Sequence, residues 1–151
     1  MDEKKQSIRM VDVSGKNMVK RYAEAVGNIV LQPETITRIR DGTTKKGNVL
    51  AVAETAGILA AKHTSDSIPL CHQIPLTSVE IGFEFAKTGI QATCRVSAIY
   101  LTGVEMEALT GVTIALLSIW DMVKYLEKDS EGQYPHARLE NIRVTMKRKG
   151  E

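Results

Sequence analysis

The chain has 151 residues, a length that favours one domain with a buried core. Its hydrophobic share of 43% and charged share of 25% are typical of globular proteins and exclude global disorder. Twenty basic and 18 acidic residues give a net charge of +2, which argues against a nucleic-acid partner, although a local basic cluster could still hold a phosphorylated metabolite.

Residues 1–9 are charged and lack the apolar core of a signal peptide, so we expect a disordered tail there. A single domain should fill residues 10–149, beginning with a short strand at the alternating stretch Met10–Val13. No stretch approaches the ~20 uninterrupted apolar residues that span a bilayer, and we therefore expect no membrane partner.

The next segments predict one strand and two helices. Ala23–Gln32 is rich in branched apolar residues and predicts a strand. Pro33 suits the start of a helix, so Glu34–Arg40 should be a short helix. Val49–Lys62 predicts a long helix with a nearly all-apolar surface, most of which should be buried.

A β-hairpin is the strongest local prediction. Two prolines in Ser65–Pro75 argue against regular structure there. Beyond that segment, Val79–Phe85 and Ile90–Ala98 alternate between apolar and polar residues on either side of the turn Lys87-Thr88-Gly89. Such runs around a glycine turn are typical of a hairpin.

Glu105–Lys128 predicts a second long helix, and Ile142–Met146 predicts a closing strand. When the predicted strand Met10–Val13 and the short predicted helix Glu34–Arg40 are left out, the remaining predicted elements follow in the order βαββαβ. This order predicts an α+β ferredoxin-like sandwich, with two helices on one face of an antiparallel sheet. The other face of that sheet is either solvated or covered by another copy of the chain; the pattern leaves both open.

The two cysteines, Cys71 and Cys94, lack metal-binding spacing and are too few for a disulfide scaffold. We expect a cytoplasmic protein with reduced thiols and without a metal site. The absence of glycine-rich nucleotide motifs also argues against the common dinucleotide and NTPase sites.

His72 lies in the loop Ile68–Leu76, which prolines stiffen and apolar residues anchor. An imidazole held there suits ligand contact or proton transfer, although a buried turn could equally use it to bind a backbone carbonyl. Glu105 and Glu107 stand at the start of the second long helix, where carboxylates interact with the helix dipole. Because residues two apart point in different directions, at least one should face the core or a partner.

Asp121 and Lys124 are neighbours on one face of that helix. A surface ion pair is the ordinary explanation. The apolar residues around Asp121 instead favour a partly desolvated pair suited to proton transfer. Two basic pairs, Lys45-Lys46 before the first long helix and Lys20-Arg21, are candidate anion sites, or else solvated turns.

The combination of these motifs resembles one family across about Met10 to Lys147. Ile68-Pro69-Leu70-Cys71-His72 is followed by the string Thr102–Thr110 and then by Asp121-Met122-Val123-Lys124. This pattern resembles the molybdenum cofactor biosynthesis protein C family, whose members are the cyclic pyranopterin monophosphate synthases. Met10–Ser14 and Lys46-Gly47 match as well.

The resemblance implies a ferredoxin-like subunit in a hexamer, a trimer of dimers. The implied lyase reaction converts 3′,8-cyclo-7,8-dihydroguanosine 5′-triphosphate into cyclic pyranopterin monophosphate and diphosphate, without a cofactor. The implied catalytic residues are Asp121, Lys124 and Lys46. The implied substrate-binding residues are Leu70, Cys71, His72, Met106, Glu107, Glu105 and Arg21.

The chain departs from the family pattern in three places. Gln73-Ile74 follows the histidine, and Tyr100-Leu101 stands where many relatives have Gly-Lys. The basic tail Arg143–Lys149 lacks the glycine-rich ending of some bacterial members, and Lys147 or Lys149 is a candidate replacement. Whether Mg²⁺ accompanies the triphosphate stays open.

The rival hypothesis is a ferredoxin-like module that binds an effector or RNA without catalysis. RNA binding favours aromatic residues on neighbouring strands, whereas Phe83 and Phe85 share one strand and face apolar partners. If Glu107 and Asp121 lie on one helix, about 20 Å separates them. Either the helix begins after Glu107, or the second carboxylate comes from a neighbouring subunit. The dimer implied by the family resemblance favours the second alternative, an active site shared between subunits and built from the Ile68–Leu76 and Gly103–Lys124 segments.

Overall fold

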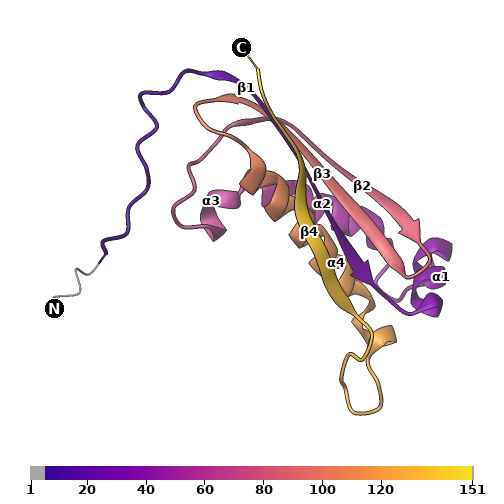
Figure 1. Ribbon diagram of the computed structural model, residues 1–151. Helices are drawn as coiled ribbons and strands as arrows, with labels where there is room; N and C mark the ends of the chain where they lie inside the picture. The colour runs from indigo at the N-terminus through magenta and orange to yellow at the C-terminus, as the bar shows by residue number, and fades with distance from the viewer. Residues whose placement is uncertain (1–5, 151) are drawn as a thin grey trace.

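The computed structural model describes residues 6–150 (Figure 1). In chain order its elements are β1 (Val19–Val30), α1 (Pro33–Asp41), α2 (Val49–Lys62), α3 (Thr64–Ser67), β2 (Leu76–Ala86), β3 (Gly89–Tyr100), α4 (Glu105–Glu127) and β4 (Arg138–Lys149). The strands form one antiparallel sheet in the order β2-β3-β1-β4. With α2 and α4 as the two long crossover helices, this arrangement confirms the predicted ferredoxin-like α+β sandwich.

The predicted hairpin is confirmed and runs further than the alternating residues alone indicated. β2 and β3 pair along their whole length, from Leu76 opposite Ala98 to Ala86 opposite Gly89. Gly89 is required there because a Cβ would lie 1.8 Å from the carbonyl oxygen of Ile29 on β1. The hairpin thereby packs directly against the central strand.

Two predictions for the loops were wrong. Met10–Val13 is not a strand: it lies outside the four-stranded sheet, and the Val11 carbonyl accepts a hydrogen bond from the His72 side chain. The Ser65–Pro75 segment is not wholly irregular, since one helical turn, α3, closes through a hydrogen bond from Ile68 N–H to the Thr64 carbonyl. The predicted tail falls partly on residues 1–5, which lie outside the described range; residues 6–9 are exposed and form no helix or strand.

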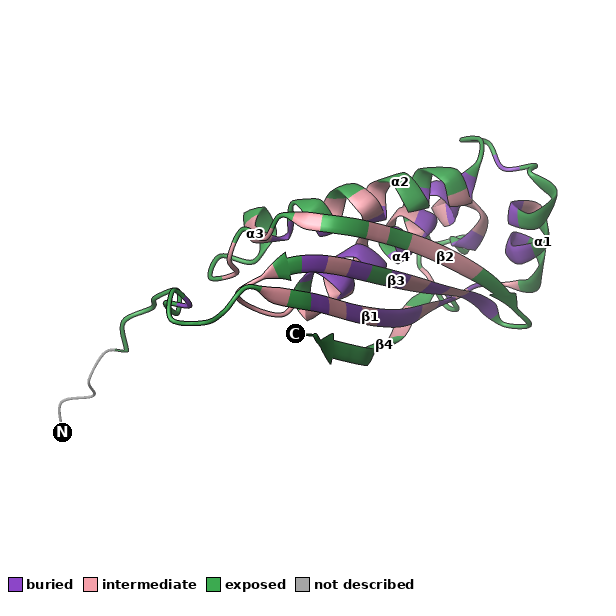
Figure 2. Ribbon diagram, turned by 90° about the horizontal axis from the view of Figure 1, so that it is seen from above, coloured by how far each residue is buried: buried purple, intermediate pink, exposed green. Residues whose placement is uncertain are grey.

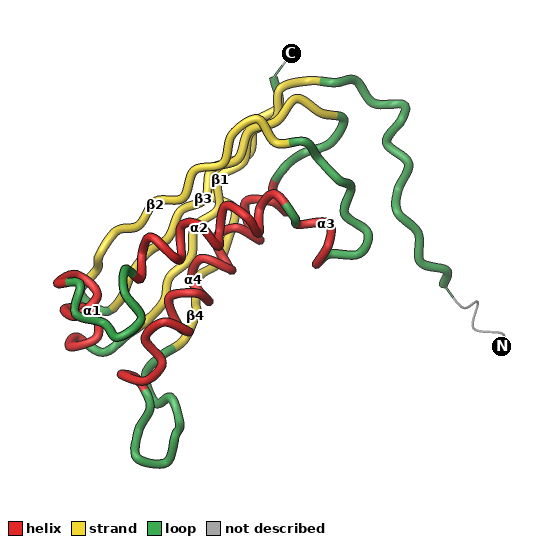
Figure 3. Tube along the Cα trace, turned by 180° about the vertical axis from the view of Figure 1, so that it is seen from behind, coloured by secondary structure: helices red, strands yellow, loops and turns green. Residues whose placement is uncertain are grey.

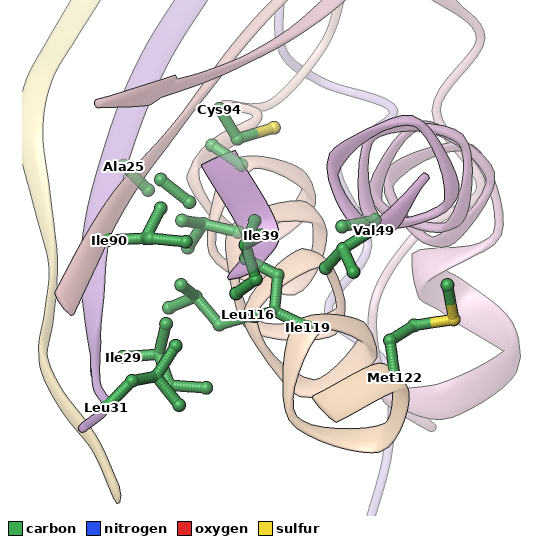
Figure 4. Packing of buried hydrophobic residues seen from close by; sticks show 14 of the residues in the cluster. Ala25, Ile29, Leu31, Ile39, Val49, Ile90, Cys94, Leu116, Ile119 and Met122 are labelled. Carbon is green, nitrogen blue, oxygen red and sulfur yellow. The ribbon is translucent and has the colours of Figure 1, made fainter. Parts of the chain in front are cut away.

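Both long helices cover the same face of the sheet (Figure 3). The core between them and the strands includes Ile29, Ile90, Leu116 and Ile119, whose side chains point toward one another in Figure 4. Cys94 is fully buried in this layer, and burial raises the pKa of its thiol to about 12. Cys94 is therefore a packing residue that stays protonated.

α4 is long and apolar enough to cross a membrane, judged by length and composition alone. Half of its most apolar stretch is buried within the fold. The buried residues of α4 pack against the sheet and α2, as in the core helix of a soluble protein.

The prediction that most of α2 is buried was wrong for the single chain. Its buried residues recur every four positions, at Val49, Ala53, Gly57 and Ala61, and mark only one side of the helix. On the other side Val52 is 44% exposed and Leu59 is 50% exposed. Figure 2 shows exposed stretches of ribbon along α2. A helix in the outer layer of a two-layer fold has neighbours on one side only, so its apolar outer side stays uncovered.

Candidate active site

Asp121 is held between two lysines near the C-terminal end of α4. Its Oδ1 lies 3.0 Å from Lys124 Nζ, and its Oδ2 lies 3.2 Å from Lys46 Nζ. Hydrogen bonds from Lys124 and then from Lys46 hold the pKa of Asp121 below its usual range, and Asp121 in turn raises the pKa of Lys124. At neutral pH the cluster is therefore a carboxylate between two ammonium groups, in direct hydrogen-bond contact.

The predicted desolvation of Asp121 is absent from the single chain. The Asp121 side chain is 58% exposed, and those of Lys46 and Lys124 are 45% and 43% exposed. The apolar neighbours of Asp121 in the sequence, such as Met122 and Val123, turn inward on the helix and leave the carboxylate outside. Charge pairing, and not burial, sets its pKa here.

Lys46 reaches Asp121 from a tight turn between α1 and α2. The Thr44 hydroxyl donates to the Gly47 carbonyl at 2.7 Å, and Gly47 has a φ of +99°, a conformation that favours glycine. Asn48 then caps α2 by accepting a hydrogen bond from Ala51 N–H at 3.0 Å. This local geometry explains why Lys-Gly-Asn stands directly before the helix.

The carboxylates at the other end of α4 have different surroundings. Glu107 is 3% exposed, and its burial raises the pKa to about 7, with a further contribution from the charge of Glu105. Such a carboxyl group can both donate and accept a proton near neutral pH. Glu105 accepts a hydrogen bond from Lys147 at 3.3 Å through Oε1, while its Oε2 is buried without a hydrogen-bond partner among residues 6–150.

The Leu70-Cys71-His72 loop lies beside these carboxylates. Burial, and then the charges of Glu107 and Glu105, raise the pKa of Cys71, so its thiol stays protonated. His72 Nε2 donates to the Val11 carbonyl at 2.6 Å. Residues Met10–Ser14, His72 and Leu101 line a cavity of about 400 Å³. The N-terminal segment, predicted as a strand, thus borders the candidate site instead.

Arg21 joins the same end of the molecule from β1. Its guanidinium donates to the Leu101 carbonyl at 3.1 Å and to the Tyr100 carbonyl at 3.4 Å, and the residue is 8% exposed. These contacts fix Arg21 against the segment that leads into α4. Leu70 and Met106, in contrast, are 44% and 36% exposed and face outward.

The predicted residues therefore form two groups at opposite ends of α4. Asp121 gathers with Lys46 and Lys124, whereas Cys71 and His72 gather near the start of the helix with the two glutamates. α4 begins at Glu105, before Glu107, so the alternative of a later helix start is excluded. Within the single chain the residues of each group lie close together, but the two groups lie far apart.

Three contacts in these groups escaped prediction from sequence. Lys147 was a candidate replacement for a missing lysine, but its contact with Glu105 was not predicted. A backbone carbonyl was one alternative partner for His72, but Val11 was not identified as the residue that supplies it. The third is the phenol of Tyr125, which accepts a hydrogen bond from Lys45 N–H at 2.7 Å. Tyr125 lies one turn beyond Asp121, a spacing that could have suggested a shared face.

Comparison with known proteins identifies the family. A model described as the MoaC family matches residues 10–150, nearly the whole chain. The chain belongs to the MoaC family. This membership confirms the resemblance on which the site residues were chosen.

The curated relatives match along at least nine-tenths of their own lengths. A protein of Thermococcus kodakarensis is 61% identical over 151 residues, covering 100% of this chain and 96% of the relative. One of Pyrococcus abyssi is 60% identical over 147 residues, covering 97% and 91%. One of Methanosarcina acetivorans is 54% identical over 142 residues, covering 94% and 90%. Each is named a probable cyclic pyranopterin monophosphate synthase.

Proposed function

We propose that this chain is a cyclic pyranopterin monophosphate synthase of molybdenum cofactor biosynthesis. It converts 3′,8-cyclo-7,8-dihydroguanosine 5′-triphosphate into cyclic pyranopterin monophosphate and releases diphosphate, a lyase reaction. The observation that carries the proposal is Asp121 held between Lys46 and Lys124 in a chain of the MoaC family.

The Asp121 cluster suits the proton transfers of this reaction. Opening the bridged ring system and closing a cyclic phosphate both move protons, and Asp121 with Lys124 forms a relay pair in direct contact. The ammonium of Lys46 shares the same carboxylate, so a proton released at one lysine has a neighbouring acceptor. The two cations also stabilise negative charge on the departing diphosphate.

The residues at the start of α4 form the binding half of the proposed site. Arg21 and His72 are the proposed holders of phosphate oxygens. Arg21 has five guanidinium N–H groups, of which two bind the Tyr100 and Leu101 carbonyls, and His72 lines the cavity beside the same segment. Glu107 and Glu105 receive the polar edge of the forming pterin. Leu70, Cys71 and Met106 supply its apolar contacts.

A second copy of the chain completes the proposed site. Met106, Leu117 and Asp121 follow one outward side of α4, with Leu117 50% exposed, and the exposed Val52 of α2 lines the same surface beside Asp121. Antiparallel packing of two such surfaces brings the Glu107 end of one α4 toward the Asp121 end of the other. We accordingly propose shared sites in a hexamer, a trimer of dimers.

The proposed enzyme works in the cytoplasm on a small molecule. Its two cysteines are both free, as in proteins of reducing compartments. Lysines, a histidine and carboxylates supply both the acid–base chemistry and the stabilisation of charge, so the proposed reaction needs no redox cofactor. Neither a nucleic acid nor a membrane is part of the proposal.

Diphosphate release tests the proposal directly. Asp121→Asn and Lys124→Ala should each lower kcat by about 10²-fold or more, the usual contribution of a positioned acid or base. Glu140→Gln is the matched control, because Glu140 forms a similar exposed pair with Arg138 on β4, outside both groups of site residues. If Asp121→Asn or Lys124→Ala releases diphosphate at a rate near that of the wild-type protein, the proton-relay assignment is wrong. A wild-type protein that binds the triphosphate without releasing diphosphate would instead be a regulatory module.

A further inference from the structure

The contact between Lys46 and Asp121 depends on where a turn is held. Lys46 stands in the turn Thr44–Gly47, between α1 and α2, and both side chains of the ion pair are about half exposed. An ion pair between such exposed side chains stabilises a loop only weakly. Another contact must therefore fix the turn against α4.

Tyr125 makes that contact. Its phenolic oxygen accepts a hydrogen bond from the backbone N–H of Lys45 at 2.7 Å, and Lys45 Nζ lies 5.0 Å from the centre of the tyrosine ring. Tyr125 follows Asp121 by four residues, so the two side chains are neighbours on α4. One patch of the helix thus holds both the carboxylate and the anchor of the turn that carries its partner.

The other hydrogen bonds of the turn are local. Thr44 Oγ1 donates to the Gly47 carbonyl at 2.7 Å, and Gly47 N–H donates to the Thr44 carbonyl at 3.4 Å. They shape the turn but do not fix it relative to α4. Within residues 6–150, only the Tyr125 phenol and the Lys46 side chain join this turn to α4 by hydrogen bonds.

We infer that Tyr125 is a positioning residue, whose hydroxyl holds the Lys45-Lys46 turn so that Lys46 reaches Asp121. Its effect on turnover rests on the proposed function. A backbone anchor one residue from Lys46 restricts where its ammonium can lie, and small misplacements of a catalytic group lower the rate steeply. Tyr125 itself acts through Lys46.

The anchor also affects the charge state of Asp121. The charged groups facing this carboxylate are Lys124 on α4 itself and Lys46 on the turn, and Tyr134 of the α4–β4 loop lies near Lys124. When the turn is no longer held by Tyr125, Lys46 moves away from Asp121, and Lys124 remains as the cation bound to that carboxylate. The pKa of Asp121 then rises toward its usual value.

Tyr125→Phe tests the inference, because it removes the hydroxyl and keeps the ring. We expect kcat to fall about three- to tenfold and KM to change less than about twofold, as for loss of one positioning hydrogen bond. Tyr22→Phe is the matched control, since the Tyr22 hydroxyl contacts Glu24 on the opposite face of the sheet. In a Lys46→Ala background, Tyr125→Phe should cause no further loss. The same loss in both backgrounds, or equal kcat for Tyr125→Phe and Tyr22→Phe, would overturn the inference.

Two measurements test the anchor without turnover. Hydrogen exchange at the Lys45 amide should be faster in Tyr125→Phe while the buried amides of α2 and α4 keep their protection. The carboxyl resonance of Asp121, followed by NMR, should titrate at higher pH in the variant. An unchanged Lys45 amide together with an unchanged Asp121 pKa overturns the inference. Failure of the wild-type protein to release diphosphate refutes the proposed function instead and leaves these two results to decide on Tyr125.

Discussion

Glu107 and Asp121 lie on the same continuous helix, 14 residues and hence about 20 Å apart. Glu107 is buried at the first turn and Asp121 is exposed three to four turns later. A straight α-helix cannot bring its own ends together. If one small substrate touches both carboxylates, as we propose, it lies between two copies of the chain.

A shared site predicts that two inactive variants restore each other. His72→Ala and Asp121→Asn lie in the two different halves, so a mixed dimer has one site with both changes and one with neither. Co-expression in equal amounts should recover about a quarter of the wild-type diphosphate release, because half of the dimers are mixed and each has one intact site.

The control for this experiment combines two variants of one half. Asp121→Asn co-expressed with Lys124→Ala changes the same half twice, and every site keeps at least one substitution. We expect no recovery from that pair. Absence of recovery from both pairs, with mixed oligomers verified by mass spectrometry, would contradict sharing.

Glu107 predicts a stability that depends on pH. Burial raises its pKa from an ordinary 4.5 to about 7. Below pH 4.5 the carboxyl is protonated in both the folded and the unfolded chain, so its burial does not reduce the free energy of unfolding through ionisation. As pH rises from about 4.5 to 7 the unfolded chain loses the proton first, so folding is destabilised by up to about 3 kcal/mol, and the loss stays constant above pH 7.

Glu107→Gln should remove this dependence. Urea denaturation of both proteins at pH 5 and pH 8 measures it: the wild-type protein should lose more stability than the variant over that interval. Glu84→Gln, at an exposed strand position, should follow the wild-type protein. Parallel pH profiles for wild type and Glu107→Gln would show that the Glu107 pKa is not raised by folding.

The crossing of α2 and α4 predicts a strict requirement for glycine. A Cβ on Gly111 would lie 2.7 Å from the Sγ of Cys94 and 3.2 Å from the carbonyl oxygen of Gly57. Gly111→Ala should lower the free energy of unfolding by about 1–3 kcal/mol through overpacking. Gly82→Ala, where a Cβ meets nothing within 4 Å, serves as the control in the same thermal denaturation experiment. Cys94→Ala in the Gly111→Ala background should restore part of the loss.

Glu127 predicts a long-range helix cap. Its carboxylate is 1% exposed and accepts from Gln32 N–H at 3.2 Å and from the Thr35 hydroxyl, at the start of α1. Glu127→Ala leaves these buried donors without their acceptor and should destabilise the fold by about 1–3 kcal/mol. Urea denaturation should detect this, with the exposed Glu131→Ala close to wild type. Equal stability of the two variants would contradict the cap.

The two long helices and the hairpin could be predicted because their signals are local. Apolar residues of β3, such as Cys94 and Val96, alternate along a few positions, and any strand with one covered face shows that alternation. Met10–Val13 shows the same alternation, yet it lies outside the sheet, beside His72 and Leu101, a placement that a local pattern does not report. In the same way, apolar content alone could not reveal that one side of α2 is uncovered.

The family resemblance allowed the residues of the candidate site to be named from the sequence. Their contacts with one another could not be predicted in this way. Lys46 and Asp121 are separated by 75 residues and meet because α2 packs beside α4. Lys45 reaches Tyr125 across 80 residues for the same reason. No spacing rule links positions so far apart, since only packing brings them together.

By itself, the sequence determined the two long helices, the hairpin, the α+β class and the family, because side-chain periodicity and motif spacing are properties of neighbouring residues. The tertiary structure alone decided that α4 runs unbroken from Glu105 past Asp121 and separates the candidate site residues into two groups. It also decided that Asp121 stays exposed between two lysines while Glu107 is buried. Burial and charge pairing depend on which elements pack together, and these determine how each carboxylate holds its proton.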